Sequence, residues 1–301
     1  MSDHPATIAP TEAVPPKEVP QPDAGLRKGT DWWAEAKGMV WLLLAVLAFH
    51  SLIAKPFYIP SESMMPTLIK GDRLVVTKYP YGWSYVSPSF HVLPFVKGRL
   101  FGKLPERGDV VIAKPPQADS DYIKRVVGLP GDRIEVRRGI LILNGVPVKR
   151  EERGEAMIPI DANVPCLTDG EIDHAVVTPE GKRFCALPLV RETLPNGRSY
   201  DTIDLGPHAS QGDDYGPVVV PAGHVFLMGD NRDESADSRY SLLESGLGGP
   251  LPIENLGGRA EFITFSLDGT SQWFNPISWI TALRGGRAGT SLHPTKGPQP
   301  K

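Results

Sequence analysis

One uninterrupted apolar run constrains this sequence more than any other feature. Residues 38–54 read GMVWLLLAVLAFHSLIA, a stretch of 17 residues without a charged side chain. That length is near the lower limit for a helix that crosses the hydrocarbon core of a bilayer. Trp32 and Trp33 precede the run and Phe57 and Tyr58 follow it, so amphipathic rings lie where both headgroup layers would be. The run therefore predicts a membrane-spanning helix.

Two other interpretations of the run fit the sequence less well. A cleaved secretory signal has a short basic leader and small residues before the cut, whereas this leader is long and proline-rich and the run ends in LIA. A buried core helix normally shows a polar face, and only His50 and Ser51 are polar here. We predict a single transmembrane anchor over residues 32–55.

Basic residues are unevenly distributed around the anchor. Arg27, Lys28 and Lys37 lie before the apolar run, while Lys55 alone follows it closely. Because positive residues are retained on the cytoplasmic side, this favours a cytoplasmic N-terminus and an outward-facing remainder. Residues 1–31 are rich in proline and charge, so little apolar surface offsets the entropy of ordering them, and we predict a disordered cytoplasmic tail.

Composition excludes several function classes. The formal net charge of −3 gives no basic footprint, so we expect no nucleic-acid partner. The only two cysteines, Cys166 and Cys185, cannot make a dense disulfide framework or a four-thiolate metal site, although one disulfide is open to them. We expect no metal and no cofactor.

The chain after the anchor has the pattern of β structure. Short β-branched or aromatic runs are separated by Gly, Pro, Asp or Asn, which is the usual punctuation of strands. These runs are DRLVVTKY, GDVVIAK, YIKRVVG, DRIEVRR, ILIL, VFLMG and RAEFITFSL. Asn144-Gly145, between ILIL and VPV, is a two-residue hairpin signal.

The strand pattern weakens in the middle of the chain, where turn residues are dense. We therefore predict a mainly β fold in which residues 56–148 and 218–287 form the larger domain and residues 149–217 form an inserted smaller β domain. A second disordered tail is predicted over residues 288–301. Near it lies a group of large apolar side chains that suits either an interfacial contact or the core: Trp273, Phe274, Ile277, Trp279 and Ile280.

Two segments carry groups suited to nucleophilic chemistry. In IPSESMMPTL, two prolines rigidify a loop with hydroxyls at Ser61 and Ser63, although a serine between prolines is more often only a turn. In YIKRVVG, strand alternation puts Lys124 on one face with Tyr122 and Val126, where apolar neighbours could enclose it. A lysine acts as a neutral base near pH 7 to 8 only if burial lowers its pKa by about 2 to 3 units, and a strand lysine that reaches water is the commoner case.

A third segment, GDNRDESADSR at residues 229–239, is acidic but does not predict a calcium site. It lacks the central Gly and the distal Glu of an EF-hand, and Arg232 and Arg239 oppose cation binding. A polar turn organised by internal ion pairs fits better, and RGDVVI at residues 107–112 is taken as structural. No histidine falls in the serine loop or the acidic turn, and no G-x-S-x-G, H-E-x-x-H or Walker A motif occurs.

Taken together and in this order, PSESMMPTL, RGDVVIAKP, YIKRVVGLPGD and GDNRDESADSR resemble the conserved boxes of bacterial type I signal peptidases, also called leader peptidases. The matching residues, 57–68, 107–132 and 229–260, make up about a quarter of the chain. The resemblance implies an antiparallel β catalytic core with an inserted smaller β domain. It also implies a serine endopeptidase that removes N-terminal signal peptides from exported preproteins.

Residue by residue, the resemblance makes Ser63 the nucleophile and Lys124 the base that takes its proton. The oxyanion hole is then the N–H of Ser63 and the hydroxyl of Ser61. In the acidic turn, Ser235 matches a hydroxyl that orients the lysine amine, while Asp237 and Arg239 match a supporting pair.

The resemblance also implies subsites for small side chains at the first and third positions before the cut, as in Ala-x-Ala. These subsites map onto five apolar or aromatic residues: Phe57, Ile59, Leu68, Tyr122 and Ile123. The implied partners are signal-peptide-bearing preproteins and the lipid bilayer, close to the secretion translocon. The implied location is the bacterial inner membrane, with one span and a periplasmic catalytic domain.

The sequence departs from the family pattern in three places. Glu62 stands where glycine is common in the serine motif, and the chain has one span where better-known members have two. Cys166 and Cys185 fall in the insertion, where we predict a disulfide in an oxidising compartment.

Two alternatives stay open on the sequence alone. One is a membrane-tethered β scaffold or binding protein in which Ser63 and Lys124 are structural. The other, a self-cleaving Ser-Lys repressor, requires a DNA-binding helix pair where this chain has a tail and an anchor.

Overall fold

The structure is a computed structural model that describes residues 31–88, 98–117, 120–166, 174–207 and 210–296. The predicted N-terminal tail lies outside these residues except for Asp31. The chain divides into two units, residues 1–42 and residues 43–301. The division falls within helix α1, and every strand belongs to the second unit.

Helix α1 spans Trp32–Leu52 and contains 21 residues. It begins before the uncharged run because Asp31 caps it: the carboxylate accepts hydrogen bonds from the backbone N–H groups of Trp33 and Ala34, at 3.1 and 3.3 Å. At 1.5 Å per residue its length is about 30 Å, which matches the hydrocarbon thickness of a bilayer. In the described part of the chain it is the one helix long and apolar enough to cross a membrane.

No side chain of α1 is buried, so the core-helix interpretation is wrong. The predicted end of the anchor at residue 55 is also corrected. The helix ends at Leu52, and residues from Ala54 onward form strand β1 because their backbone pairs with β2.

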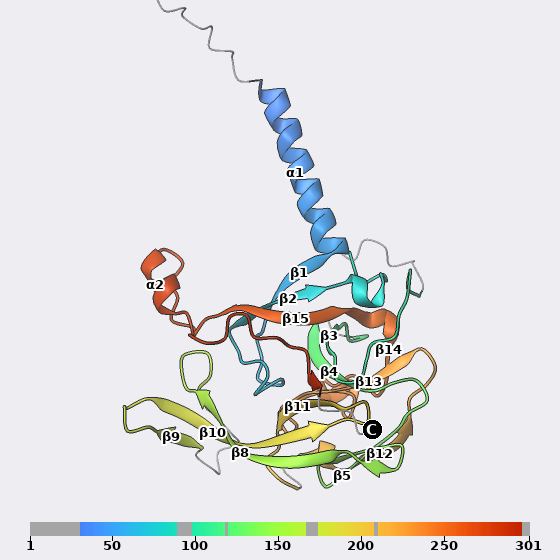
Figure 1. Ribbon diagram of the computed structural model, residues 1–301. Helices are drawn as coiled ribbons and strands as arrows, with labels where there is room; N and C mark the ends of the chain where they lie inside the picture. Colours follow the sequence, from blue (N-terminus) through green and yellow to red (C-terminus); the bar gives the residue numbers. More distant parts are fainter. Residues whose placement is uncertain (1–30, 89–97, 118–119, 167–173, 208–209, 297–301) are drawn as a thin grey trace, which may run out of the picture. The chain divides into compact units, whose positions relative to one another are not determined.

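The larger sheet has seven strands in the order β1-β2-β15-β3-β4-β13-β14. They are β1 (Ala54–Tyr58), β2 (Asp72–Thr77), β15 (Leu256–Ser266), β3 (Val110–Ala113), β4 (Tyr122–Gly128), β13 (His224–Met228) and β14 (Leu251–Pro252). Figure 1 shows β15, drawn in orange-red, between strands from the N-terminal half of the chain. Each of these strand pairs is antiparallel, so the mainly antiparallel β fold is confirmed.

A second sheet contains most of the predicted insertion. Its order is β16-β11-β10-β8, and β9 also pairs with β10. The strands are β8 (Lys149–Pro159), β9 (Ala175–Val177), β10 (Arg183–Thr193), β11 (Arg198–Ile203) and β16 (Thr295–Lys296). We call it the inserted sheet.

A third, four-stranded sheet has the order β12-β5-β6-β7. Its strands are β5 (Arg133–Arg137), β6 (Ile140–Leu143), β7 (Val146–Pro147) and β12 (Tyr215–Val219). The hairpin predicted at Asn144-Gly145 is confirmed, because β6 pairs with β7 across these two residues. Asn144 and Gly145 also have the positive φ angles that such a turn requires, 54° and 81°.

Short helices complete the described elements. They are η1 (Tyr79–Tyr81), η2 (Gln211–Asp213), η3 (Leu242–Glu244), η4 (Ile253–Asn255) and α2 (Pro276–Thr281).

The C-terminal part of the chain differs from the prediction in two ways. The tail predicted from residue 288 is wrong for residues 288–296, because β16 pairs with β11 and Leu292 donates its backbone N–H to Glu261. Residues 297–301 lie outside the described chain. The apolar group around α2 is not core, since all five of its members are exposed, Phe274 to 95%.

Candidate active site

The serine loop, residues 59–68, is fixed by the core on both sides of Ser63. Ile59, Met64 and Leu68 are buried in one hydrophobic cluster. Within the loop, the N–H of Met65 donates to the carbonyl of Glu62 at 3.0 Å, which closes a tight turn around Ser63. The apolar side chains thus hold the loop while the Ser63 side chain retains 8% exposure.

Lys124 lies on β4, which is hydrogen-bonded to β3 on one side and β13 on the other. The residue is only 4% exposed, because every residue of β4 after Tyr122 is buried. Its Nζ atom donates a hydrogen bond to Ser63 Oγ at 2.7 Å. It also lies 5.5 Å from the centroid of the Tyr122 ring, in agreement with the predicted shared face.

Burial changes the protonation of this lysine. The pKa of Lys124 falls from 10.5 to about 8, mainly through loss of hydration on burial, and the nearby positive charge of Arg239 acts in the same direction. The carboxylates of Asp237 and Asp230 act in the opposite direction. With a pKa of about 8, roughly one amine in ten is neutral at pH 7 and half are neutral at pH 8.

A second hydroxyl stands beside the first. Ser61 Oγ lies 3.4 Å from Ser63 Oγ. Glu62, between them, is half-buried, and this burial raises the pKa of its carboxyl group although Lys70 opposes the effect. Its side chain shares a small pocket with Met65 and Asn231. The residue that replaces the common glycine therefore leaves both hydroxyls side by side.

The acidic turn contains the predicted supporting pair. Asp237 and Arg239 are buried, and the guanidinium donates two hydrogen bonds of 2.9 Å to the carboxylate. Burial by itself raises the pKa of Asp237, but the charge and hydrogen bonds of Arg239 bring it below the usual value. The ionised carboxylate is thus held close enough to influence Lys124.

Ser235, predicted to orient the Lys124 amine, does not make that hydrogen bond. It is buried, and its Oγ has no hydrogen-bond partner among the residues that the structure describes. Gly229 shows how tightly this region packs, because a Cβ there would collide with the Ser235 hydroxyl and the Ser63 carbonyl. Only glycine lets the acidic turn approach the serine loop so closely.

The predicted subsite residues divide into two groups. Phe57, Ile59, Leu68 and Ile123 share one hydrophobic cluster with the serine loop. Tyr122 instead packs against a separate cluster on β4, and its hydroxyl donates to the carbonyl of Ser245 at 2.9 Å. Phe57 and Tyr122 are partly exposed, whereas the other three are buried.

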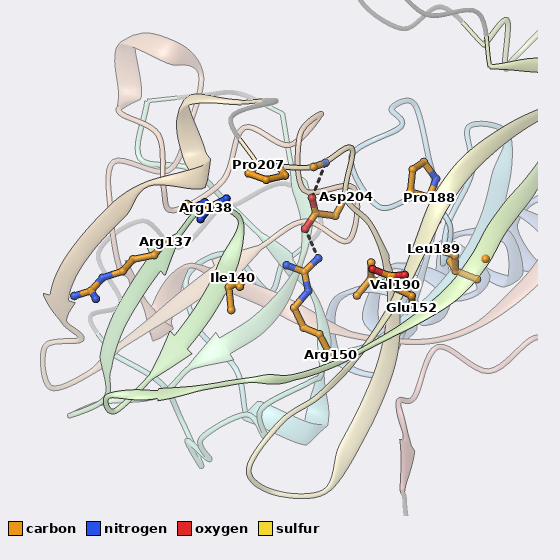
Figure 2. A pocket seen from close by; sticks show the side chains of 12 residues that line it. Arg137, Arg138, Ile140, Arg150, Glu152, Pro188, Leu189, Val190, Asp204 and Pro207 are labelled. Carbon is orange, nitrogen blue, oxygen red and sulfur yellow. Dashed lines mark hydrogen bonds and ion pairs between the residues drawn. The ribbon is translucent and has the colours of Figure 1, made fainter.

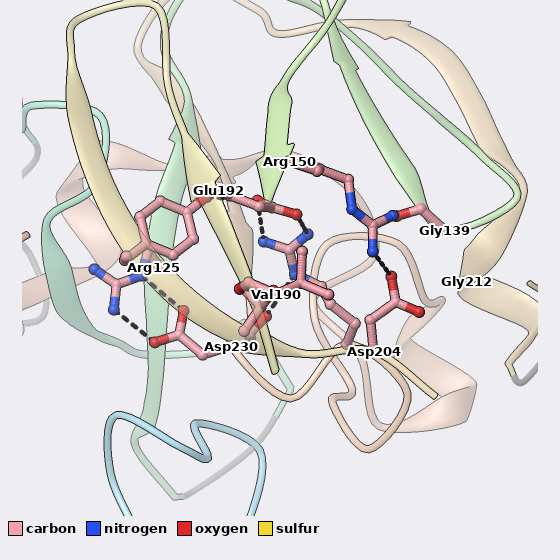
Figure 3. Close-up of polar contacts among 12 residues, drawn as sticks. Arg125, Gly139, Arg150, Val190, Glu192, Asp204, Gly212 and Asp230 are labelled. Atoms are coloured by element: carbon pink, nitrogen blue, oxygen red, sulfur yellow. Dashed lines mark hydrogen bonds and ion pairs between the residues drawn. The ribbon is translucent and has the colours of Figure 1, made fainter. Parts of the chain in front are cut away.

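Two buried ion pairs that the sequence did not reveal join β4 to the acidic turn and the acidic turn to the inserted sheet. Arg125 binds Asp230 at 2.5 and 2.7 Å (Figure 3). Arg232 binds Glu192 at 2.5 and 2.7 Å. The hydroxyl of Tyr200 also donates to Glu192, at 3.0 Å. Arg125 and Arg232 flank predicted site residues, but Glu192 and Tyr200 lie in the weakly patterned insertion, where nothing in the local sequence indicates a partner.

Cys166 and Cys185 form a disulfide in the structure, with Cα atoms 5.5 Å apart. Cys185 is buried in a cluster with Met65 and Ile69, two residues that follow Ser63 in the chain. The disulfide therefore packs beneath the serine loop.

A separate pocket lies between the β5-β6 hairpin and the inserted sheet (Figure 2). Arg137, Arg138 and Arg150 line it, but Arg150 is neutralised by Asp204 at 2.5 Å. None of the residues predicted for the site lines this pocket. Across the described residues, no group of three or more His, Cys, Asp or Glu could hold a metal ion.

A hydroxyl hydrogen-bonded to a buried amine of lowered pKa is an arrangement that can supply a nucleophile and a general base. Comparison with known proteins then defines the family. The family model described as signal peptidase, peptidase S26, matches residues 32–265. The chain therefore belongs to the signal peptidase family.

Curated relatives extend this similarity over most of the chain. The signal peptidase I of Rickettsia canadensis (strain McKiel) is 35% identical over 87% of this chain and 94% of its own length. That of Rickettsia akari (strain Hartford) is 34% identical over 88% of this chain and 93% of its own. Among solved structures, a signal peptidase I from Enterococcus faecalis V583 matches with 21% identity and a TM-score of 0.27, covering 52% of this chain and 97% of that one.

Proposed function

We propose that this protein cuts signal peptides from exported preproteins, with Ser63 as the nucleophile and Lys124 as the general base. The observation that carries the proposal is the 2.7 Å contact between Ser63 Oγ and Lys124 Nζ, made by an amine that burial brings to a pKa of about 8. Membership of the signal peptidase family supports the same reaction.

The reaction follows from this geometry. Neutral Lys124 removes the proton of Ser63 as Oγ attacks the scissile carbonyl carbon, which gives a tetrahedral oxyanion and an ammonium group. The N–H of Ser63 and the hydroxyl of Ser61 donate to the oxyanion. Lys124 returns the proton to the departing amine of the mature protein, so the signal peptide stays as an ester on Ser63. A water molecule, deprotonated by Lys124, then hydrolyses this ester and releases the signal peptide.

The acidic turn places two opposite charges near the Lys124 amine. Asp237 and Arg239 influence the Lys124 amine with opposite signs. Because the two charges neutralise each other, burial remains the largest influence on its pKa. Ser235, whose hydroxyl is buried and unpaired among the described residues, is the further polar group to which the family resemblance gives the role of orienting the amine.

Small side chains suit the apolar wall beside the pair. Phe57 lies on β1, a terminal strand of the large sheet as described, and packs with Ile123 in one cluster. An extended substrate added alongside β1 gains backbone hydrogen bonds, while the wall accepts a methyl group and crowds larger residues. We therefore expect cleavage after Ala-x-Ala sequences.

The anchor delivers the site to its substrate. Helix α1 is long enough to span the inner membrane once, with the N-terminus cytoplasmic and the β domain periplasmic, close to the translocon. The exposed Trp273, Phe274 and Ile277 add an apolar contact with the lipid surface. A site at the membrane surface meets a signal peptide where its hydrophobic segment ends.

Cleavage of a purified preprotein tests the proposal. Ser63→Ala and Lys124→Met should each abolish cleavage, whereas a matched substitution of an exposed lysine, Lys103→Met, should leave it unchanged. Retained cleavage in either of the first two variants would refute the pair, and no cleavage by the unmodified protein would favour the scaffold interpretation.

The pH dependence gives an independent test of the base. Because only the neutral amine accepts the proton, kcat/KM should rise with pH through an apparent pKa near 8. A rate already maximal at pH 6 would show that Lys124 is not the base.

A further inference from the structure

Asn231, in the acidic turn, binds two consecutive carbonyl groups of the serine loop. Its backbone N–H donates to the carbonyl of Ser63 at 3.2 Å. Its side-chain Nδ2 donates to the carbonyl of Glu62 at 3.3 Å. The residue is 2% exposed, so water does not compete for these contacts.

One of these contacts acts on the group that should bind the oxyanion. The carbonyl of Glu62 and the N–H of Ser63 belong to the same planar peptide and point in opposite directions. A donor that fixes this carbonyl therefore fixes the direction of the Ser63 N–H. It also polarises the peptide, which makes the N–H a stronger donor.

We propose that Asn231 is a positioning residue that orients the Ser63 N–H toward the oxyanion. The proposal rests on the assignment of Ser63 as the nucleophile. In this role the amide of Asn231 acts through the peptide between Glu62 and Ser63 and not on the substrate.

The inserted sheet holds Asn231 in this position. Ile203, the last residue of β11, accepts from the N–H of Arg232 and donates to the carbonyl of Asp230, both at 2.9 Å. Asn231 lies between these two bonds and forms a parallel bridge with Ile203. Its two neighbours are also held by buried ion pairs, Arg232 with Glu192 and Asp230 with Arg125 (Figure 3).

The turn of the serine loop limits the size of the effect. The carbonyl of Glu62 also accepts from the N–H of Met65 at 3.0 Å, so loss of Asn231 leaves one donor in place. Removing an oxyanion donor outright typically costs a hundred- to a thousandfold in rate. Releasing one of two constraints on that donor should cost less, about 10- to 100-fold in kcat.

Steady-state cleavage by the full-length protein tests this role. Asn231→Leu keeps the branched shape and removes the donor, and Asn231→Ala removes the side chain beyond Cβ. Both should lower kcat about 10- to 100-fold with KM within about twofold, because the oxyanion exists only in the transition state. The apparent pKa of the kcat/KM profile should stay near 8, since Lys124 keeps its surroundings.

The matched control is Asn255→Ala. Asn255 is also buried and also donates its side-chain amide to a backbone carbonyl, that of Lys114 at 2.8 Å, but it does not contact the serine loop. This variant should keep kcat within about twofold of the unmodified protein.

The outcomes separate the two proposals. Unchanged kcat in both Asn231 variants, with Ser63→Ala inactive, would overturn the positioning role and leave the nucleophile in place. An equal loss in Asn255→Ala, or a shifted pH profile in the Asn231 variants, would also overturn it, because general destabilisation or a disturbed base would then explain the result. Cleavage by Ser63→Ala would instead refute the proposed function itself.

Discussion

Replacing Lys124 by methionine should stabilise the protein while abolishing its activity. The pKa of Lys124 falls from 10.5 in water to about 8 in the fold, where the amine is 4% exposed. Each pKa unit corresponds to about 1.36 kcal/mol, so burying the charged amine costs about 3 kcal/mol at pH 7. The lost hydrogen bond to Ser63 is worth about 1 kcal/mol, which leaves a net gain of about 2 kcal/mol in the free energy of unfolding.

The gain in the free energy of unfolding of Lys124→Met should depend on pH. Below pH 8 the amine is protonated in both the folded and the unfolded chain, so the full cost is present. As the pH rises from about 8 to 10.5, the folded protein loses its proton first and the cost disappears. The advantage of Lys124→Met should therefore be largest at pH 7 and fall away by pH 10.5.

Urea unfolding of the detergent-solubilised protein at several pH values measures this difference. The comparison between the two proteins isolates Lys124, which matters because burial also lowers the pKa of Lys78 to about 8. The exposed substitution Lys103→Met is the control and should show no such gain. If Lys124→Met were less stable at pH 7, or its advantage did not vary with pH, the buried-base reasoning would be wrong.

Three further predictions concern the surroundings of the site. Cys166→Ser should lower the free energy of unfolding by about 3 kcal/mol, because the disulfide to Cys185 closes a loop between residues 19 apart; equal urea midpoints for the variant and the unmodified protein would contradict it. Glu192→Gln should lower the free energy of unfolding by about 3 to 5 kcal/mol, because it leaves Arg232 buried without its charged partner. Thermal unfolding measures this loss, and equal melting temperatures for the variant and the unmodified protein would disprove it. Ile123→Ala removes bulk from the apolar wall beside Lys124, so a preprotein with valine in place of alanine at the cleavage site should become a substrate. Unchanged discrimination between the alanine and valine preproteins would count against that subsite.

Much of the architecture could be predicted from local patterns. All seven predicted strand segments correspond to observed strands, from Asp72–Thr77 to Leu256–Ser266. Alternation of β-branched residues with turn residues is a property of neighbouring positions, so it can be recognised in the sequence before the fold is known. The prediction of a tail was wrong over residues 288–296, because β16 contains no apolar pattern and forms only by pairing with β11.

By itself, the sequence determined the long apolar helix, the β class and the candidate pair, because an apolar run, strand periodicity and a family motif are each formed by consecutive residues. Only the tertiary structure decided that Lys124 is buried and lies 2.7 Å from Ser63. It alone brought Glu192 to Arg232 and Asn231 to the carbonyl of Glu62. The pKa of an amine and the direction of a peptide N–H depend on groups distant in the chain, so no local pattern can encode them.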